Sequence, residues 1–153
     1  MQQYVANILE GVTAPDFDAC AVYIAPPQAA AAASPCIFVW GFRDHETRRT
    51  FPRGKGFRTV EYSLYLWVKA FIEGGSPRES VAFPLLLDAI KQVLRVTPLG
   101  AAITDPDTEQ VSTIQSIGED MQTDFPGPRD VTPQGVRLYE ASINAMVIED
   151  KIG

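Results

Sequence analysis

The chain has 153 residues, of which 46% are hydrophobic and 21% charged, and its formal net charge is -6 at pH 7. This length and composition predict a single globular domain, residues 1–153, whose core can form without a disulfide or a metal. The longest apolar run, residues 81–87, is much shorter than the roughly 20 residues that span a bilayer, so neither a membrane helix nor a membrane partner is expected.

The first part of the chain predicts one short helix and one short strand. Apolar residues at helical spacing over 3–10, followed by Gly11, indicate a helix that ends at a glycine cap. Residues 19–24 favour a brief strand that stops at two prolines. The alanine-rich segment 28–34 lies between prolines and has no capping residues, so we expect a loop there.

The clearest strand signals are at residues 36–42 and 59–72, which are rich in β-branched and aromatic residues. In the second of these, one face is apolar and the other mixes polar residues with aromatic ones such as Trp67, which would need a partner. The connecting segment 43–58 is too long for a tight turn. We therefore expect a long protruding β-arm at this point.

Charge is concentrated in this arm. Residues 43–58 hold six of the thirteen basic residues of the chain against two acidic ones, a balance of +4, which leaves seven basic and seventeen acidic residues elsewhere, or -10. Such asymmetry favours head-to-tail contact between identical subunits as readily as contact with nucleic acid. The plainer alternative is a solvated hairpin tip.

The second half of the chain predicts one long helix and two strands. A wide apolar stripe over 81–94 indicates the main helix, with its regular part beginning at Pro84. Strands are expected over 111–121 and 136–148. Because no helix-strand unit repeats, we predict an α+β fold: a mostly antiparallel twisted sheet packed on one main helix, with a short N-terminal helix and the protruding β-arm.

No catalytic, cofactor-binding or metal site is predicted. The one histidine, His45, lies between two acids in the arm, and no nucleophile is close to it in sequence. Two cysteines, Cys20 and Cys36, are too few to bind structural zinc. They could form a disulfide only if their strands were adjacent, so we expect two buried thiols. The acidic turn 105–109 lacks the glycine and glutamate of a calcium loop, and the glycine-rich segment 53–56 lacks phosphate-loop spacing.

Composition also bears on nucleic acid and on the compartment. A sequence pI near 4.7 opposes general affinity for a polyanion. An acidic body suits a conduit through which DNA passes without sequence-specific binding. The first residues lack the pattern of a secretory signal, so we expect the protein in a cytoplasm.

Taken together, the segments resemble the tail terminators of long-tailed bacteriophages and the related neck and tail-completion proteins. The resemblance is carried by the short N-terminal helix, the strand-arm-strand unit 36–72 with "EYSLYLWVKA", the helix "FPLLLDAIKQVL" and the closing strands "STIQSIGEDM" and "GVRLYEASINAMVIED". It implies a structural virion protein without catalysis or cofactors that is assembled in the host cytoplasm. Such a protein forms a hexameric ring, caps the tail tube protein and meets head-tail connector proteins.

Within that resemblance, we expect the arm to contact a neighbouring subunit or the tail tube protein. Arginine suits this role because its planar group binds carboxylates through two hydrogen bonds, while exposed pairs contribute only about 0.2 to 1 kcal/mol each and apolar anchors must supply the affinity. The expected interface residues are Arg43, Arg48, Arg49, Phe51, Arg53, Lys55, Phe57, Arg58 and Trp67, and the expected acidic partner surface is Glu119, Asp120, Glu149 and Asp150.

Three other interpretations remain open. The nearest is a head-completion or neck connector protein of the same particle. A second is a small enzyme or cofactor-binding protein with a pocket under the loop 29–33. A third is a small non-viral adaptor that binds peptides through its basic arm.

Overall fold

The computed structural model describes residues 1–27, 33–49, 57–96, 102–104, 111–131 and 133–152. These residues form two helices and seven strands. The elements are α1 (Gln2–Leu9), β1 (Ala21–Tyr23), β2 (Cys36–Arg49), β3 (Phe57–Glu73), α2 (Glu79–Val96), β4 (Ala102–Thr104), β5 (Val111–Asp124), β6 (Arg129–Asp130) and β7 (Val136–Ile152).

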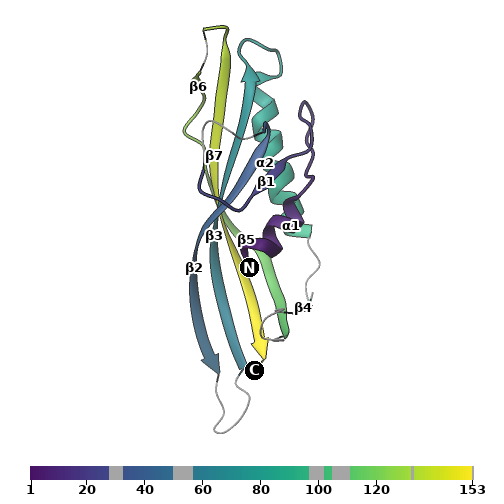
Figure 1. Ribbon diagram of the computed structural model, residues 1–153, viewed down its shortest axis with the longest axis vertical. Coiled ribbons are helices and arrows are strands. Elements are labelled where there is room, and N and C mark those ends of the chain that lie inside the picture. Colours follow the sequence, from purple (N-terminus) through teal and green to yellow (C-terminus); the bar gives the residue numbers. More distant parts are fainter. Residues whose placement is uncertain (28–32, 50–56, 97–101, 105–110, 132, 153) are drawn as a thin grey trace.

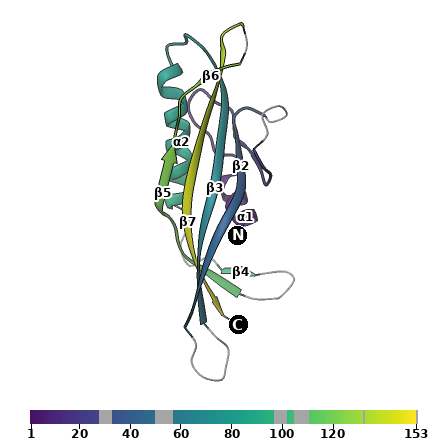
Figure 2. The same ribbon diagram turned by 90° about the vertical axis from the view of Figure 1, so that its left-hand side faces the viewer.

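All seven strands belong to one sheet with the order β1-β2-β3-β7-β5-β4, and β6 pairs with β7. Strand β1 runs parallel to β2, and every other pair is antiparallel. Figure 2 shows the four long strands β5, β7, β3 and β2 side by side in a twisted sheet. The α+β fold expected from the sequence is therefore confirmed, with one parallel pair at an edge of the sheet.

Both helices lie on the same side of the sheet (Figure 1), and the core is formed between them and that face. Strand β3 presents an apolar face to the helices, because its alternate residues from Val60 to Ala70 are all buried. Helix α2 contributes Phe83, Leu86 and Ile90 to the same cluster, and α1 contributes Val5, Ala6 and Leu9. Each fully buried side chain of this size stabilises the fold by about 1.5 to 3 kcal/mol.

Helix α2 begins at Glu79, five residues before the proline from which its regular part was expected. Pro84 is tolerated because it lies in the second turn, where the missing N–H removes only one helical hydrogen bond, to the carbonyl of Ser80. Its ring points to the exposed side of the helix. No helix among the described residues is long and apolar enough to cross a membrane.

The long strands continue further than the sequence pattern indicates. Strand β2 extends to Arg49 and β3 starts at Phe57, so most of the segment expected as an arm is paired strand. Strand β7 follows β3 to the same end, where Phe57 pairs with Ile152, and β5 pairs there too. The end of the sheet that projects beyond the helices (Figure 1) is therefore formed by β4, β5 and β7 as well as by β2 and β3. The pattern failed here because residues 43–49 are polar on both faces of the strand.

A bulge in β2 changes which residues face the helices. Trp40 and Gly41 together oppose Tyr65, because the register shifts between Val39 and Phe42. Gly41 has a φ of 74°, in the left-handed region that glycine adopts without strain. Beyond the bulge, odd-numbered residues of β2 take the outward positions held before it by even-numbered ones.

Candidate assembly surface

The face of the sheet opposite the helices carries a row of exposed aromatic side chains. Tyr65, Trp67 and Phe71 come from the outward positions of β3, and Trp40 comes from the bulge in β2. Each of these residues is between 38% and 45% exposed to solvent. We call these four residues the aromatic row. Large apolar side chains gathered on one uncovered face are typical of surfaces that bind another protein.

An ion pair with a buried lysine lies among these residues. Lys69 is only 8% exposed, and its Nζ lies 3.1 Å from Glu140 Oε1 and 5.7 Å from the centre of the Phe38 ring. Glu140 Oε2 also accepts a hydrogen bond of 2.9 Å from Arg129 Nη2. A buried ammonium group requires such a partner, because an unpaired charge away from water is costly. The pair therefore neutralises the charge beneath the aromatic row and ties β3 to β7.

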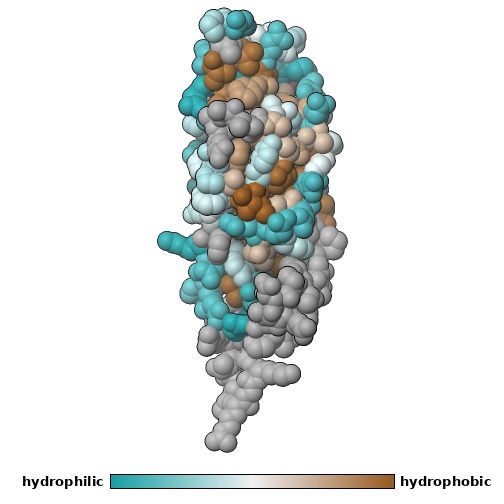
Figure 3. Space-filling view, viewed as in Figure 1, coloured by the Kyte–Doolittle hydropathy of each residue, from teal (hydrophilic) through white to brown (hydrophobic). Residues whose placement is uncertain are grey.

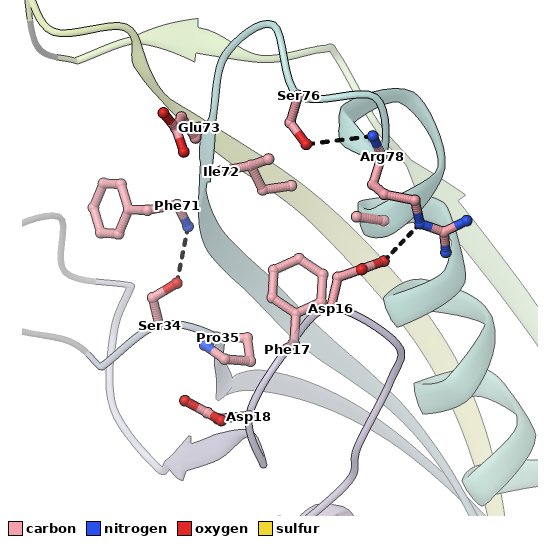
Figure 4. Close-up of a pocket in the computed structure, with 11 residues that line it drawn as sticks. Asp16, Phe17, Asp18, Ser34, Pro35, Phe71, Ile72, Glu73, Ser76 and Arg78 are labelled. Atoms are coloured by element: carbon pink, nitrogen blue, oxygen red, sulfur yellow. Dashed lines mark hydrogen bonds and ion pairs between the residues drawn. The ribbon is translucent and has the colours of Figure 1, made fainter.

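At the far end of β3, the aromatic row meets a cleft of about 320 Å³. Phe71 and Glu73 come from β3, Asp16, Phe17 and Asp18 from the loop after α1, and Arg78 from the turn before α2 (Figure 4). Phe71 thus belongs to both the row and the cleft.

Hydrogen bonds hold the walls of this cleft in place. Asp16, at a φ of 72°, accepts a 3.0 Å bond from Arg78 Nε, and the backbone N–H of Phe71 donates to Ser34 Oγ at 2.9 Å. Asp16, Asp18 and Glu73 line the cleft together with Arg78, so its lining carries a formal charge of about -2. Among the residues that the structure describes, no group of three or more His, Cys, Asp or Glu side chains could hold a metal ion.

A second network fixes the start of α2 against β7. Glu79 Oε1 accepts hydrogen bonds of 2.8 Å from both Arg137 Nη1 and Tyr139 Oη, and Glu79 Oε2 accepts one of 2.8 Å from the backbone N–H of Gly75. The bond from Gly75, followed by that from Tyr139, lowers the pKa of the Glu79 carboxyl. Arg137 also donates to Asp130 Oδ1 at 3.0 Å. Every contact in this set is internal, so its role is structural.

Three of the expected interface residues lie within the described side chains. Arg43 is exposed on β2 opposite Ser63, and Trp67 is part of the aromatic row. Arg58 is partly buried, and its Nη1 lies 3.6 Å from Glu46 Oε2 of the same chain. Arg43 and Trp67 are therefore available to a partner, while Arg58 is partly engaged.

The acidic surface in the structure differs from the one that the sequence predicts. Glu149 is only 4% exposed and lies 3.7 Å from Lys151 Nζ, so it presents no carboxylate to a neighbouring subunit. It occupies a core-facing position of β7, which a charge pattern alone does not reveal. Asp150 accepts a 2.7 Å hydrogen bond from Thr59 Oγ1. Asp120 is exposed and lines a small hollow together with Ser63, Gln122, Asn144 and Met146.

Several expectations fall outside the described residues. These are the side chains of Arg48, Arg49, Phe57 and Glu119, the whole of Phe51, Arg53 and Lys55, the acidic turn 105–109, and residues 29–32 of the loop 29–33 under which an enzyme pocket was expected.

Cys20 directly precedes β1 and Cys36 is the first residue of the adjacent strand β2, but the two side chains face opposite sides of the sheet. Cys20 joins the core on the helix side, whereas Cys36 is the register partner of Lys69, whose side chain lies on the other side. Both are free thiols, and burial raises the pKa of each to about 11. Their side chains are therefore not placed to form a disulfide.

Sequence reasoning missed most of this surface for two reasons. Alternation alone cannot locate the bulge at Gly41, beyond which odd-numbered residues of β2 such as Arg43 face outward. The cleft joins residues 16–18 to residues 71–78, which are more than fifty positions apart in the sequence. Only the mixed aromatic face of β3 was a usable signal.

No protein-family model matches this chain, and no curated protein matches it.

Proposed function

We propose that this chain is a structural virion protein that assembles as a ring, caps the tail tube of a long-tailed bacteriophage and forms the head-tail joining interface. The proposal rests on the resemblance of its segments to tail terminators. The single structural observation that supports it is the aromatic row on the uncovered face of the sheet. Soluble proteins that act alone seldom leave large aromatic side chains gathered on one face.

In this function, the aromatic row supplies affinity and the charges supply orientation. Tryptophan and tyrosine are the residue types that most often dominate the free energy of protein-protein binding. Exposed charges such as Arg43 and Asp120 contribute little affinity, but they steer association and set its register. This division of roles needs no catalytic group, cofactor or metal.

Passage of DNA through such a ring needs no specific contacts. With a formal net charge of -6, the chain as a whole repels a polyanion. A lumen formed by such subunits would let DNA slide through without being retained.

Electron microscopy of tail tubes provides the test. Purified, gold-labelled protein is mixed with phage tail tubes assembled in its absence, and the proposal expects labelled rings at one end of each tube. A matched sample with Trp40→Ser and Trp67→Ser should leave the tube ends bare. Label along the length of the tube, or none at all, would contradict the proposal. In complete particles, label on the head side of the neck would instead support the neck-connector alternative.

A further inference from the structure

The basic segment 43–58 and the acidic cleft lie at opposite ends of β3. Arg58 is close to the start of this strand, within the segment 43–58 that has a balance of +4, and Glu73 is its last residue. At about 3.3 Å per residue, these two residues are roughly 50 Å apart. The basic end and the acidic cleft therefore cannot meet within one molecule.

The cleft is built to receive a cation that has an apolar stem. Arg78 is bonded to Asp16, and the described residues place no cation within ion-pair distance of Asp18 or Glu73. Phe17 lines the cleft, and Phe71 links it to the aromatic row. A guanidinium group can donate two hydrogen bonds to a carboxylate and stack on an aromatic ring at the same time.

We propose that a second copy of this chain docks here, with the basic end of its β2–β3 hairpin in the cleft and against the adjoining aromatic row. The occupant is identified by charge complementarity: the hairpin end is the concentrated positive region of a chain that is otherwise acidic. The contact would be the joint between subunits of the proposed ring, and in that respect it rests on the proposed function.

Such a joint connects two different surfaces, the hairpin end of one copy and the cleft of the next. Contacts of this kind run head to tail and close into a ring when the rotation between subunits allows it. Because the charges are exposed, the joint should weaken as salt rises, since the Debye length falls to about 3 Å at 1 M. The aromatic row would retain part of the affinity.

Two charge-reversal variants test the joint. The cleft variant carries Asp18→Lys and Glu73→Lys, and the end variant carries Arg48→Glu and Arg49→Glu. Asp16 is left unchanged because Arg78 depends on it. Each variant alone should associate at least ten-fold more weakly than the wild type in sedimentation velocity. The two mixed should associate more strongly than either alone, because the native end of the cleft variant fits the native cleft of the end variant, and the reversed cleft and reversed end are again opposite in charge.

The matched control reverses two exposed acids outside the cleft, with Glu10→Lys and Asp88→Lys, and it should associate as the wild type does. If the lysine variant of the cleft unfolds, the neutral pair Asp18→Asn and Glu73→Gln replaces it, with the same expected loss. Wild-type association of a folded cleft variant, or a mixture that remains monomeric, would overturn the inference.

The outcomes separate this inference from the proposed function. If the cleft variant still forms rings that cap tail tubes, the function stands and the docking site is elsewhere. If the wild type joins through the cleft but never binds a tube end, the docking site stands and the function falls.

Discussion

The hydroxyl group of Tyr139 donates a 2.8 Å hydrogen bond to Glu79 Oε1, which joins the middle of the sheet to the first turn of α2. Arg137 and the backbone of Gly75 bind the same carboxylate. Through this group, the helix that covers the core is held at a fixed position on β7.

The Glu79 contact should make the stability of the fold depend on pH. Its carboxyl has a lowered pKa in the folded protein, so its contribution is fully present above the unfolded value of about 4.3 and is lost as pH falls through the folded value. Urea denaturation of Glu79→Gln should give a midpoint below that of the wild type at pH 7, with the difference shrinking at acid pH. Glu10→Gln, at an exposed glutamate, is the control. A difference that stayed constant with pH would contradict this interpretation.

Phe83 should be one of the most sensitive positions of the core. It is fully buried, and its ring centre lies 5.2 Å from that of Phe125 and 5.4 Å from that of Tyr139. Phe83→Ala should lower the free energy of unfolding by about 3 to 5 kcal/mol, through lost burial and the cavity it leaves. Phe71→Ala, which truncates the same side chain at an exposed position, should change it by less than about 1 kcal/mol. Equal losses in the two variants would show that the burial assigned to Phe83 is wrong.

The sequence predicts some parts of this fold and leaves others without a signal. The core face of β3 and the stripe of α2 were predicted because burial imposes a period of two or 3.6 residues on neighbouring positions. The continuation of β2 through residues 43–49 left no such trace, since both of its faces there carry polar residues and pairing to β3 alone defines the strand. The burial of Glu149 is likewise a tertiary effect that its charge conceals.

The bulge at Gly41 should be needed to place Arg43 on the outward face of β2. With a φ of 74°, any L side chain at this position is strained, and an added Cβ would lie 3.4 Å from Tyr65 Cδ2. Gly41→Ala should therefore cost about 1 kcal/mol or more in unfolding experiments. Gly41→Asn should cost less, because asparagine enters the left-handed region more readily. An alanine variant as stable as the wild type would argue against the bulge.

Cys20 and Cys36 should resist modification in the folded protein. Both are buried, and a pKa of about 11 leaves very little thiolate at neutral pH. Iodoacetamide at pH 7.5 should label neither thiol in native protein and both in urea, as counted by mass spectrometry. Rapid native labelling would contradict their burial, and absence of labelling in urea without reductant would reveal a disulfide.

The aromatic row should supply most of the affinity between subunits. Trp40→Ser combined with Trp67→Ser is expected to weaken self-association at least ten-fold, about 1.4 kcal/mol or more, without unfolding the chain. Val96→Ser removes another exposed apolar side chain, at the end of α2, and should have little effect on association. Equal losses from both variants would mean that binding is not localised to the row.

The most direct test of the account is the mass of the purified protein in solution, measured by light scattering over a range of protein and salt concentrations. We expect association toward a particle of about six times the 16.8 kDa mass of the chain, weaker at high salt and weaker still in the double tryptophan variant. A monomer under every condition would contradict assembly of this chain through its own surface.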